Sequence, residues 1–237
     1  MNKLFYLIIT KANKKIFFAY FRNFILNFFN KKKRKIFINN YRKFLNTKKY
    51  TFDFFSQNTF DWNRILLNFK EKNFNYLEVG SFEGNSALFI FKFFNPKTVC
   101  CCDAWTPLPK RDGSDEGYAD FDMPTVEKNF DHNLKDYENR FKKFKMKSDY
   151  FFQKNEITFD LIYIDGSHFG EDVLKDSKSA WRILNKDGIL IFDDYFWKSY
   201  KKIESNPAYA INTFLNSISG KYEVLYLSKF QLFIKKL

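Results

Sequence analysis

The stretch "YLEVGSFEGNS", residues 76–86, joins an apolar run to a predicted helix through an acidic residue and two glycines. Nucleotide-like ligands often lie against such a strand-to-helix turn, because small residues let them approach the backbone. The dinucleotide fingerprint G-x-G-x-x-G has three glycines, and its tight G-x-G is missing here. Glu78, Gly80 and Gly84 thus suggest a ligand without a pyrophosphate, whose cationic or amine end can meet the glutamate. Taken alone the pattern is weak, and an ordinary tight turn explains it better.

From about residue 58 the apolar pattern alternates between predicted strands and helices. The strands are predicted at 75–79, 97–105, 159–166, 188–195, 222–227 and 231–236. The helices are predicted at 58–70, 85–94, 124–141, 171–184 and 208–218. Buried strands separated by helices predict an α/β fold with a mostly parallel sheet covered on both faces, closed by a C-terminal hairpin.

The segment between Trp105 and Pro124 is rich in Pro, Gly and Asp and has no periodicity. Long irregular segments are uncommon in compact domains unless they bind something or move. Ligands of open parallel sheets bind beyond the carboxyl ends of the strands. We therefore expect this segment to act as a lid over a substrate.

The net charge of +13 is concentrated at the N-terminus. Residues 1–52 hold 14 Lys or Arg and no acid, whereas the chain from Asp53 onward carries 26 basic and 27 acidic residues. We predict a basic, Phe-rich, helical arm at 1–52 and one domain at 53–237. Because the domain is nearly neutral, the overall charge gives little support to nucleic-acid binding.

The arm permits two interpretations. Its apolar run at 16–29 is too short and too interrupted to span a bilayer, and no signal-peptide cleavage site follows the first apolar run. Phe17, Phe21, Phe24 and Phe28 recur at helical spacing, followed by the basic run 31–35. This is typical of a helix lying on an anionic membrane, and equally of a helix packed on the domain. RNA binding is a weaker third option.

Cys100, Cys101 and Cys102 are consecutive. On a strand they point to alternate faces, so they cannot converge on one metal and form no disulfide framework. We expect them to be small core residues in a reducing compartment.

Acidic residues stand where four predicted strands end, and Glu78 is at the end of the first. Asp103 ends the second strand, about 20 residues after the glycine turn, where an acid can bind a ribose. Asp165, Asp193 and Asp194 end two later strands, which places them at the same sheet edge. Buried carboxylates need compensation, and hard cations such as Mg²⁺ take oxygen ligands. A helix N-cap or a turn would explain each aspartate singly, but together they favour a ligand site.

The motifs LEVGSFEGNS, CCDAW, KSD, FDLIYIDGSH and GILIFDDYFW occur in this order within residues 58–237. They resemble the class I S-adenosylmethionine-dependent methyltransferases. More narrowly, they are similar to the metal-assisted small-molecule O-methyltransferases that act on macrolide sugars and on catechols. The resemblance implies a Rossmann-like fold with a mostly parallel seven-stranded sheet, helices on both faces and a C-terminal antiparallel hairpin. The arm lies outside it.

The resemblance implies a set of cofactor-binding residues: Glu78, Gly80, Ser81, Gly84, Ser86, Asp103, Ser148 and Asp165. The glutamate and the two glycines correspond to the methionine end of S-adenosylmethionine. Ser86 corresponds to a contact with the methionine carboxylate, Asp103 to one with the ribose and Ser148 to one with the adenine.

The same resemblance implies a metal site and a base. Asp165, Asp193 and Asp194 match the metal-ligand positions, with Mg²⁺ as the expected ion. His168 matches the general base, and with Asp165 it forms the expected catalytic pair. The catechol branch has Lys at the base and Asp-Asn at the second metal pair. Both departures favour an aliphatic, sugar-like hydroxyl as the acceptor.

The chemistry explains why a base and a cation would occur together. An aliphatic hydroxyl with a pKa near water's value of about 15.7 costs about 12 kcal/mol to ionise at pH 7. Histidine, with an ordinary pKa of about 6.5, cannot supply that energy alone. A cation that lowers the hydroxyl pKa makes its proton accessible to His168. Alternatively, His168 caps the helix that begins near Glu171; His132, within the predicted helix 124–141, is expected to be structural.

The sequence thus predicts a methyltransferase that transfers a methyl group from S-adenosylmethionine to a hydroxyl of a small molecule, with a sugar of polysaccharide or glycolipid biosynthesis favoured. The alternative is a non-catalytic membrane- or RNA-associated protein that keeps the fold as a binding platform. We expect a cytoplasmic location, with peripheral contact to the inner face of the membrane through residues 1–50 as one possibility. Nucleic acid is not an expected partner, and self-association is left open.

Overall fold

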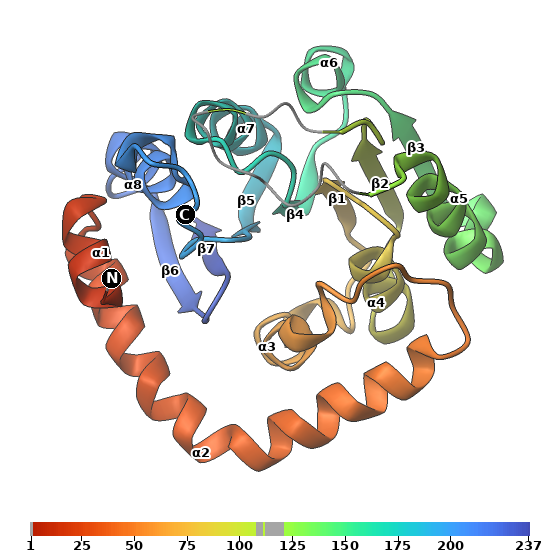
Figure 1. The fold of residues 1–237 in the computed structure, drawn as a ribbon, viewed down its shortest axis with the longest axis horizontal. Coiled ribbons are helices and arrows are strands. Elements are labelled where there is room, and N and C mark those ends of the chain that lie inside the picture. The colour runs from red at the N-terminus through yellow and green to blue at the C-terminus, as the bar shows by residue number, and fades with distance from the viewer. Residues whose placement is uncertain (1, 108–110, 112–120) are drawn as a thin grey trace.

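The computed structural model describes residues 2–107, 111 and 121–237. Most of the segment predicted to be a lid lies outside the described residues. The strands are β1 (Asn75–Val79), β2 (Thr98–Asp103), β3 (Phe141–Lys145), β4 (Phe159–Ile164), β5 (Leu184–Phe192), β6 (Tyr222–Leu227) and β7 (Leu232–Lys236). They form one sheet in the order β3-β2-β1-β4-β5-β7-β6 (Figure 1).

Strands β1 to β5 are mutually parallel where they pair, and β7 runs antiparallel to both β5 and β6. The seven-stranded, mostly parallel sheet with a C-terminal antiparallel hairpin is therefore confirmed. The helix predicted over 124–141 is wrong in its second half. It ends as α5 (Met123–Leu134), a 3₁₀ segment η3 (Lys135–Arg140) follows, and "FKKFK" becomes β3.

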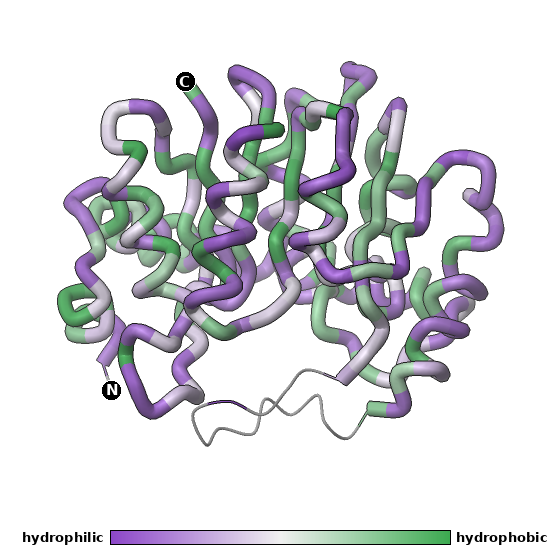
Figure 2. Tube along the Cα trace, turned by 90° about the horizontal axis from the view of Figure 1, so that it is seen from above, coloured by the Kyte–Doolittle hydropathy of each residue, from purple (hydrophilic) through white to green (hydrophobic). Residues whose placement is uncertain are grey.

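Helices cover both faces of the sheet. One face packs against α6 (Ser148–Lys154), α7 (Gly170–Ile183) and α8 (Pro207–Ser217), and the other against α3 (Thr59–Ile65), α4 (Asn85–Phe93) and α5. Strand residues alternate between these two cores, with Cys100 and Cys102 in the first and Cys101 in the second. The three cysteines are buried and form no disulfide, as predicted. Figure 2 shows hydrophobic residues in the interior segments and hydrophilic ones at the outer bends.

The N-terminal residues form α1 (Lys3–Ile9) and α2 (Lys14–Leu45). In Figure 1, α2 curves round the molecule from the side of α8 to the side of α3 and α4. Its first half packs in the core of the α8 face through Ile16 and Ala19, and its last turns pack in the opposite core through Tyr41 and Leu45. No helix in the described part of the chain is both long and apolar enough to cross a membrane.

Helix α2 also covers the edge strand β6. Lys15 Nζ donates to the carbonyl of Tyr222 at 2.8 Å, and the Arg22 guanidinium donates to the carbonyl of Leu225. An uncovered edge strand offers free backbone groups to other chains. The contact therefore explains why a strand rich in Tyr and Leu can stand last in the sheet.

Candidate functional site

Gly80 sets the geometry at the edge where β1 and β4 end. Its φ of +86° is left-handed, and a Cβ there would lie 2.0 Å from the carbonyl oxygen of Asp165. Backbone bonds hold the turns together: Gly80 N–H donates to the Cys102 carbonyl and Asp165 N–H to the Val79 carbonyl, each at 2.8 Å. Only glycine permits this approach, so the glycine turn and the acid after β4 form one unit.

Glu78 lies beneath that turn and is fully buried. The Tyr76 hydroxyl donates a hydrogen bond to Glu78 Oε2 at 2.7 Å. The other carboxylate oxygen, Oε1, is buried and has no hydrogen-bond partner with good geometry among the described residues. Burial raises the pKa of Glu78 to about 7, although the hydroxyls of Ser86, Tyr76 and Ser81 oppose the shift. A buried carboxyl group with an unpaired oxygen suits a cationic or amine group, and the contact of Glu78 with the cofactor stays a prediction.

Asp103 organises the next loop. Its carboxylate accepts the N–H groups of Phe82 at 2.9 Å and Trp105 at 2.7 Å. Both donors have left-handed φ values, +46° and +45°, which are uncommon for aromatic residues. Partial burial raises the pKa of Asp103, and the N–H donors oppose the rise. A carboxylate has about four acceptor positions, so these bonds leave capacity for the predicted ribose hydroxyls.

Ser86 and Ser148 begin helices at the same edge of the sheet. Gly84, with φ +79°, is the residue before α4, and Ser86 lies buried in the first turn of that helix. Ser148 is the first residue of α6, and its hydroxyl hydrogen-bonds the carboxyl of Asp176. Burial raises the pKa of Asp176 to about 7. The contacts predicted for Ser86 and Ser148 with the cofactor stay predictions.

Three side chains gather beyond β4 and β5. Asp165, His168 and Asp194 each offer one ligand atom, and these atoms lie within 4.8 Å of one another. His168 Nε2 is 2.8 Å from Asp194 Oδ2. Burial raises the pKa of Asp165 well above its ordinary value, with further contributions from Asp193 and Asp194. The cluster places two carboxyl groups and an imidazole together in a partly enclosed site.

Asp193, the third predicted metal ligand, contacts Gln231 and Tyr163, and its role as a ligand stays a prediction. Its carboxylate accepts the Gln231 amide at 2.9 Å and contacts the Tyr163 hydroxyl. Tyr163 also donates to Asp165 Oδ2 at 2.7 Å. Burial, with repulsion from Asp194, raises the pKa of Asp193 to about 6. One hydroxyl carries one proton, so Tyr163 can fully satisfy only one of its two carboxylate neighbours at a time.

Phe169, not His168, is the N-cap residue of α7, and its side chain makes no capping hydrogen bond. The Ser167 hydroxyl accepts the Phe169 N–H at 3.2 Å. The imidazole instead stacks on Trp197, with ring centroids 5.1 Å apart and planes at 21°. This contact fixes the ring plane beside Asp194, where a proton acceptor would be needed.

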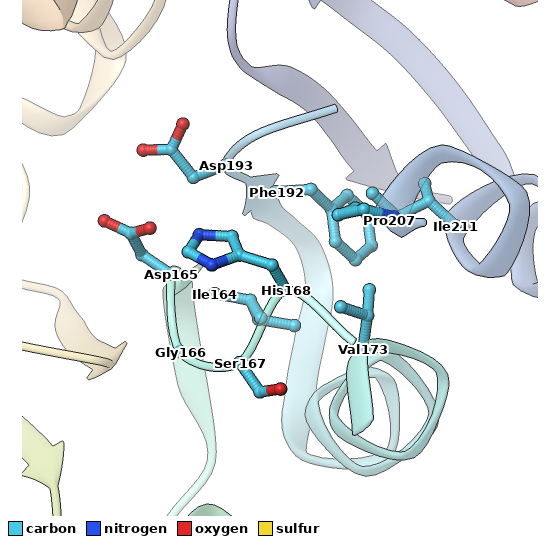
Figure 3. A pocket seen from close by; sticks show the side chains of 10 residues that line it. All are labelled: Ile164, Asp165, Gly166, Ser167, His168, Val173, Phe192, Asp193, Pro207 and Ile211. Carbon is cyan, nitrogen blue, oxygen red and sulfur yellow. The ribbon is translucent and has the colours of Figure 1, made fainter. Parts of the chain in front are cut away.

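A small cavity adjoins this cluster and is far too small for a substrate. It measures about 10 Å³ and is lined by acids on one side and apolar side chains on the other, which Figure 3 shows around the His168 ring. That volume holds at most about one water molecule. Mg²⁺ commonly binds one or two protein carboxylates and keeps several waters. The acids that line this cavity are Asp165 and Asp193, whereas Asp194 joins Asp165 and His168 in the cluster beside it. An ion that keeps several waters would therefore lie outside so small a volume.

Sequence reasoning missed four polar residues near the site. Tyr163, Gln231 and Trp62 form a buried chain in which Trp62 Nε1 donates to Gln231 Oε1 at 2.8 Å. Asp176 is the fourth. It shares the buried face of α7 with Val173 and Ala180, so an acid at an apolar helix position was the available signal. The chain through Trp62 had none, because its members come from distant parts of the sequence.

Comparison with known protein families shows that about half of the chain matches one family. Residues 77–195 match the model of a family described as "Methyltransferase domain". No curated protein sequence matches the chain.

The fold is similar to solved structures of low sequence identity. One is the MycE methyltransferase of the mycinamycin biosynthetic pathway with Mg and SAH, at 14% identity and a TM-score of 0.54 over 78% of this chain. Another is a Staphylococcus aureus protein described as a caffeoyl-CoA O-methyltransferase, at 16% identity and a TM-score of 0.55, covering 84% of this chain and 92% of the other. The chain spans about half the length of MycE (51%).

Proposed function

Because the chain belongs to the methyltransferase-domain family and is thus an S-adenosylmethionine-dependent methyltransferase, we propose that it methylates a hydroxyl of a small molecule, with a sugar as the favoured acceptor. The observation that carries the proposal is the cluster of Asp165, His168 and Asp194, which adjoins the glycine turn through the contact of Gly80 with Asp165. A proton acceptor and two carboxylates at that position suit the deprotonation of a hydroxyl.

Each part of the site has a role in this proposal. S-adenosylmethionine supplies an activated methyl group. Gly80 lets the glycine turn pack directly against the backbone of Asp165. Glu78 accepts a hydrogen bond from the cofactor's amine. His168 accepts the proton of the acceptor hydroxyl as the methyl group is transferred. Asp194, 2.8 Å from Nε2, stabilises the resulting imidazolium.

We further propose that Asp165 and Asp194 hold a divalent cation, with Mg²⁺ as the first candidate. A bound cation would lower the pKa of a coordinated hydroxyl. The donor chemistry supports this assignment, because two neighbouring carboxyl groups offer the oxygen ligands that a hard ion takes. The MycE structure named above contains Mg.

Calorimetric titration of the full chain with S-adenosylmethionine is the first test. Saturable one-to-one binding is expected; no binding at physiological concentrations would contradict the enzyme and leave the non-catalytic platform. A screen of metabolite pools for compounds that gain one CH₂ would identify the acceptor. Activity that survives chelation would remove the cation from the proposal.

His168→Ala tests the base. Loss of a general base typically lowers turnover by about 10²- to 10⁴-fold, and cofactor affinity should change little. His132→Ala, on α5, is the matched control and should keep full activity. Equal rates for the two variants would show that His168 has no catalytic role.

A further inference from the structure

The outward face of α2 exposes a continuous apolar stripe. Its members are large side chains that are at least half exposed: Phe18, Phe21, Phe24, Ile25, Phe28, Phe29 and Ile36. Phe24, Phe28 and Phe29 are each exposed by 75% or more. With about 100° per residue, the seven side chains fall within an arc of about 140°. Exposed apolar patches of this kind mark interaction sites.

The opposite side of α2 is the side that packs on the domain. Ile16, Ala19, Asn23, Tyr41 and Leu45 are buried, and they lie within an arc of about 80° roughly opposite the stripe. The helix therefore has two apolar faces, and only one of them is needed for folding. The stripe is not explained by packing within the chain.

Unpaired cations accompany the stripe. Lys31, Lys32, Lys33 and Lys35 are exposed, and none of them forms an ion pair with the described residues; the ion pairs of α2 involve Arg34 and Arg42. At the other end of the stripe, an open groove of about 680 Å³ runs between α2 and β6. It is lined by Phe18 and three cations, Lys14, Lys15 and Arg22, against one acid, Glu223.

We propose that the outward face of α2 docks on a membrane surface rich in anionic phospholipid. Aromatic and aliphatic side chains would enter the boundary between headgroups and acyl chains, and flanking lysines would contact the anionic headgroups. The 32-residue helix is about 48 Å long at 1.5 Å per residue. It would lie parallel to the surface along its middle turns. The proposal does not depend on the reaction catalysed.

Charge favours a membrane over a second copy of the chain. If two copies paired through the stripe about a two-fold axis, the basic run at 31–35 of one copy would lie against the same run, or against Lys14 and Lys15, of the other. Residues 1–52 contain no acid that could neutralise these charges. Like charges in contact oppose association. An anionic bilayer could instead attract the cations at both ends of the stripe.

The test is vesicle flotation of the full chain, with vesicles of phosphatidylcholine alone and of equal parts phosphatidylcholine and phosphatidylglycerol. We expect at least tenfold tighter binding to the anionic vesicles. Salt at about 0.5 M should weaken this binding, because a Debye length below about 8 Å screens the attraction between the lysines and the headgroups. The variant F24Q/F28Q/F29Q should lose at least tenfold in affinity. The variant K31Q/K32Q/K33Q/K35Q should lose the preference for anionic lipid.

The matched control is L67Q/Y150Q, which replaces two side chains of similar exposure away from α2, at 53% and 56%, and should bind as the unmodified chain does. Thermal melts of all variants should coincide, because every replaced side chain is exposed. Equal binding to both vesicle types, or unchanged binding of F24Q/F28Q/F29Q, would overturn the proposal. The proposal would also be overturned if the unmodified chain did not bind vesicles and light scattering showed that it is a dimer which F24Q/F28Q/F29Q converts to a monomer.

Discussion

At the scale of single residues, the site depends on backbone positions that tolerate little change. Gly80 combines a left-handed φ with a close approach to Asp165, and Asp194 adopts a left-handed φ of +50°. The sequence predicted both residues to belong to the site. It could not show that Gly80 is required by the backbone of a strand more than eighty residues away, because that distance is closed only by the parallel pairing of β1 with β4.

Gly80→Ala should destabilise the protein and abolish cofactor binding, because the methyl group cannot fit at 2.0 Å from a carbonyl oxygen. Gly220→Ala is a matched control: its φ of +83° is similar, but an added Cβ meets nothing within 4 Å. The control should cost only about 1–2 kcal/mol of left-handed strain. Denaturant unfolding and calorimetry measure the two effects. Equal unfolding free energies for the two variants would show that the contact with Asp165 is unimportant.

Asp176 should make stability depend on pH. Its folded pKa of about 7 exceeds its ordinary value of 3.8, so folding favours the protonated carboxyl. Below about pH 4 both states are protonated and no penalty exists. Between pH 4 and 7 the unfolded chain ionises first, and the folded state loses stability as pH rises. Asp176→Asn lacks this loss.

We compare the free energy of unfolding of Asp176→Asn with that of the unmodified chain. The difference, variant minus unmodified, should rise by up to about 4 kcal/mol between pH 4 and pH 7, at about 1.36 kcal/mol per pKa unit. Urea titrations at pH steps across this range measure it. Two curves that stay parallel would mean that the burial of Asp176 does not hold its proton.

At the scale of elements, α2 is anchored to α3 by a buried ion pair. Arg34 donates to both carboxylate oxygens of Asp61 at 2.9 and 2.7 Å, and the Asp61 side chain is only 2% exposed. The sequence showed the amphipathic spacing of the arm but left open whether it packs or docks. The structure shows that one face of the helix packs on the domain while another apolar face is exposed, and periodicity cannot resolve two apolar faces on one helix.

Arg34→Met should destabilise the protein by about 3 kcal/mol, because it leaves a buried carboxylate without its main partner. The control Arg42→Met removes an exposed pair with Asp53, where the side chains are 54% and 28% exposed, and should cost less than about 1 kcal/mol. Thermal and denaturant unfolding provide the measurement. Similar losses in both variants would show that the Arg34 pair does not anchor the helix.

At the scale of the whole molecule, the arm and the domain share both cores. Residues of α1 and α2 pack with α8 on one face of the sheet and with α4 on the other. The division into residues 1–52 and 53–237 remains a proposal about sequence units. We expect residues 53–237 to need residues 1–52 for stability. Removing residues 1–52 would expose apolar surface on both faces of the sheet and would uncover β6.

A fragment of residues 53–237 contains every proposed site residue, yet it should unfold at a markedly lower temperature than the full chain and aggregate more readily. Circular dichroism melts and light scattering at matched concentration measure this. A fragment with the melting temperature of the full chain would establish the arm as a separable unit.

The sequence by itself determined the fold class, the order of most strands and helices, and the acids at the strand ends. These follow from local apolar periodicity and from the rule that parallel strands end at one edge. Only the tertiary structure decided the strand at 141–145, the contacts of Asp193 with Tyr163 and Gln231, and which apolar face of α2 is buried and which is exposed. The physical reason is that these features depend on partners distant in the chain, and burial against such partners overrides local preference.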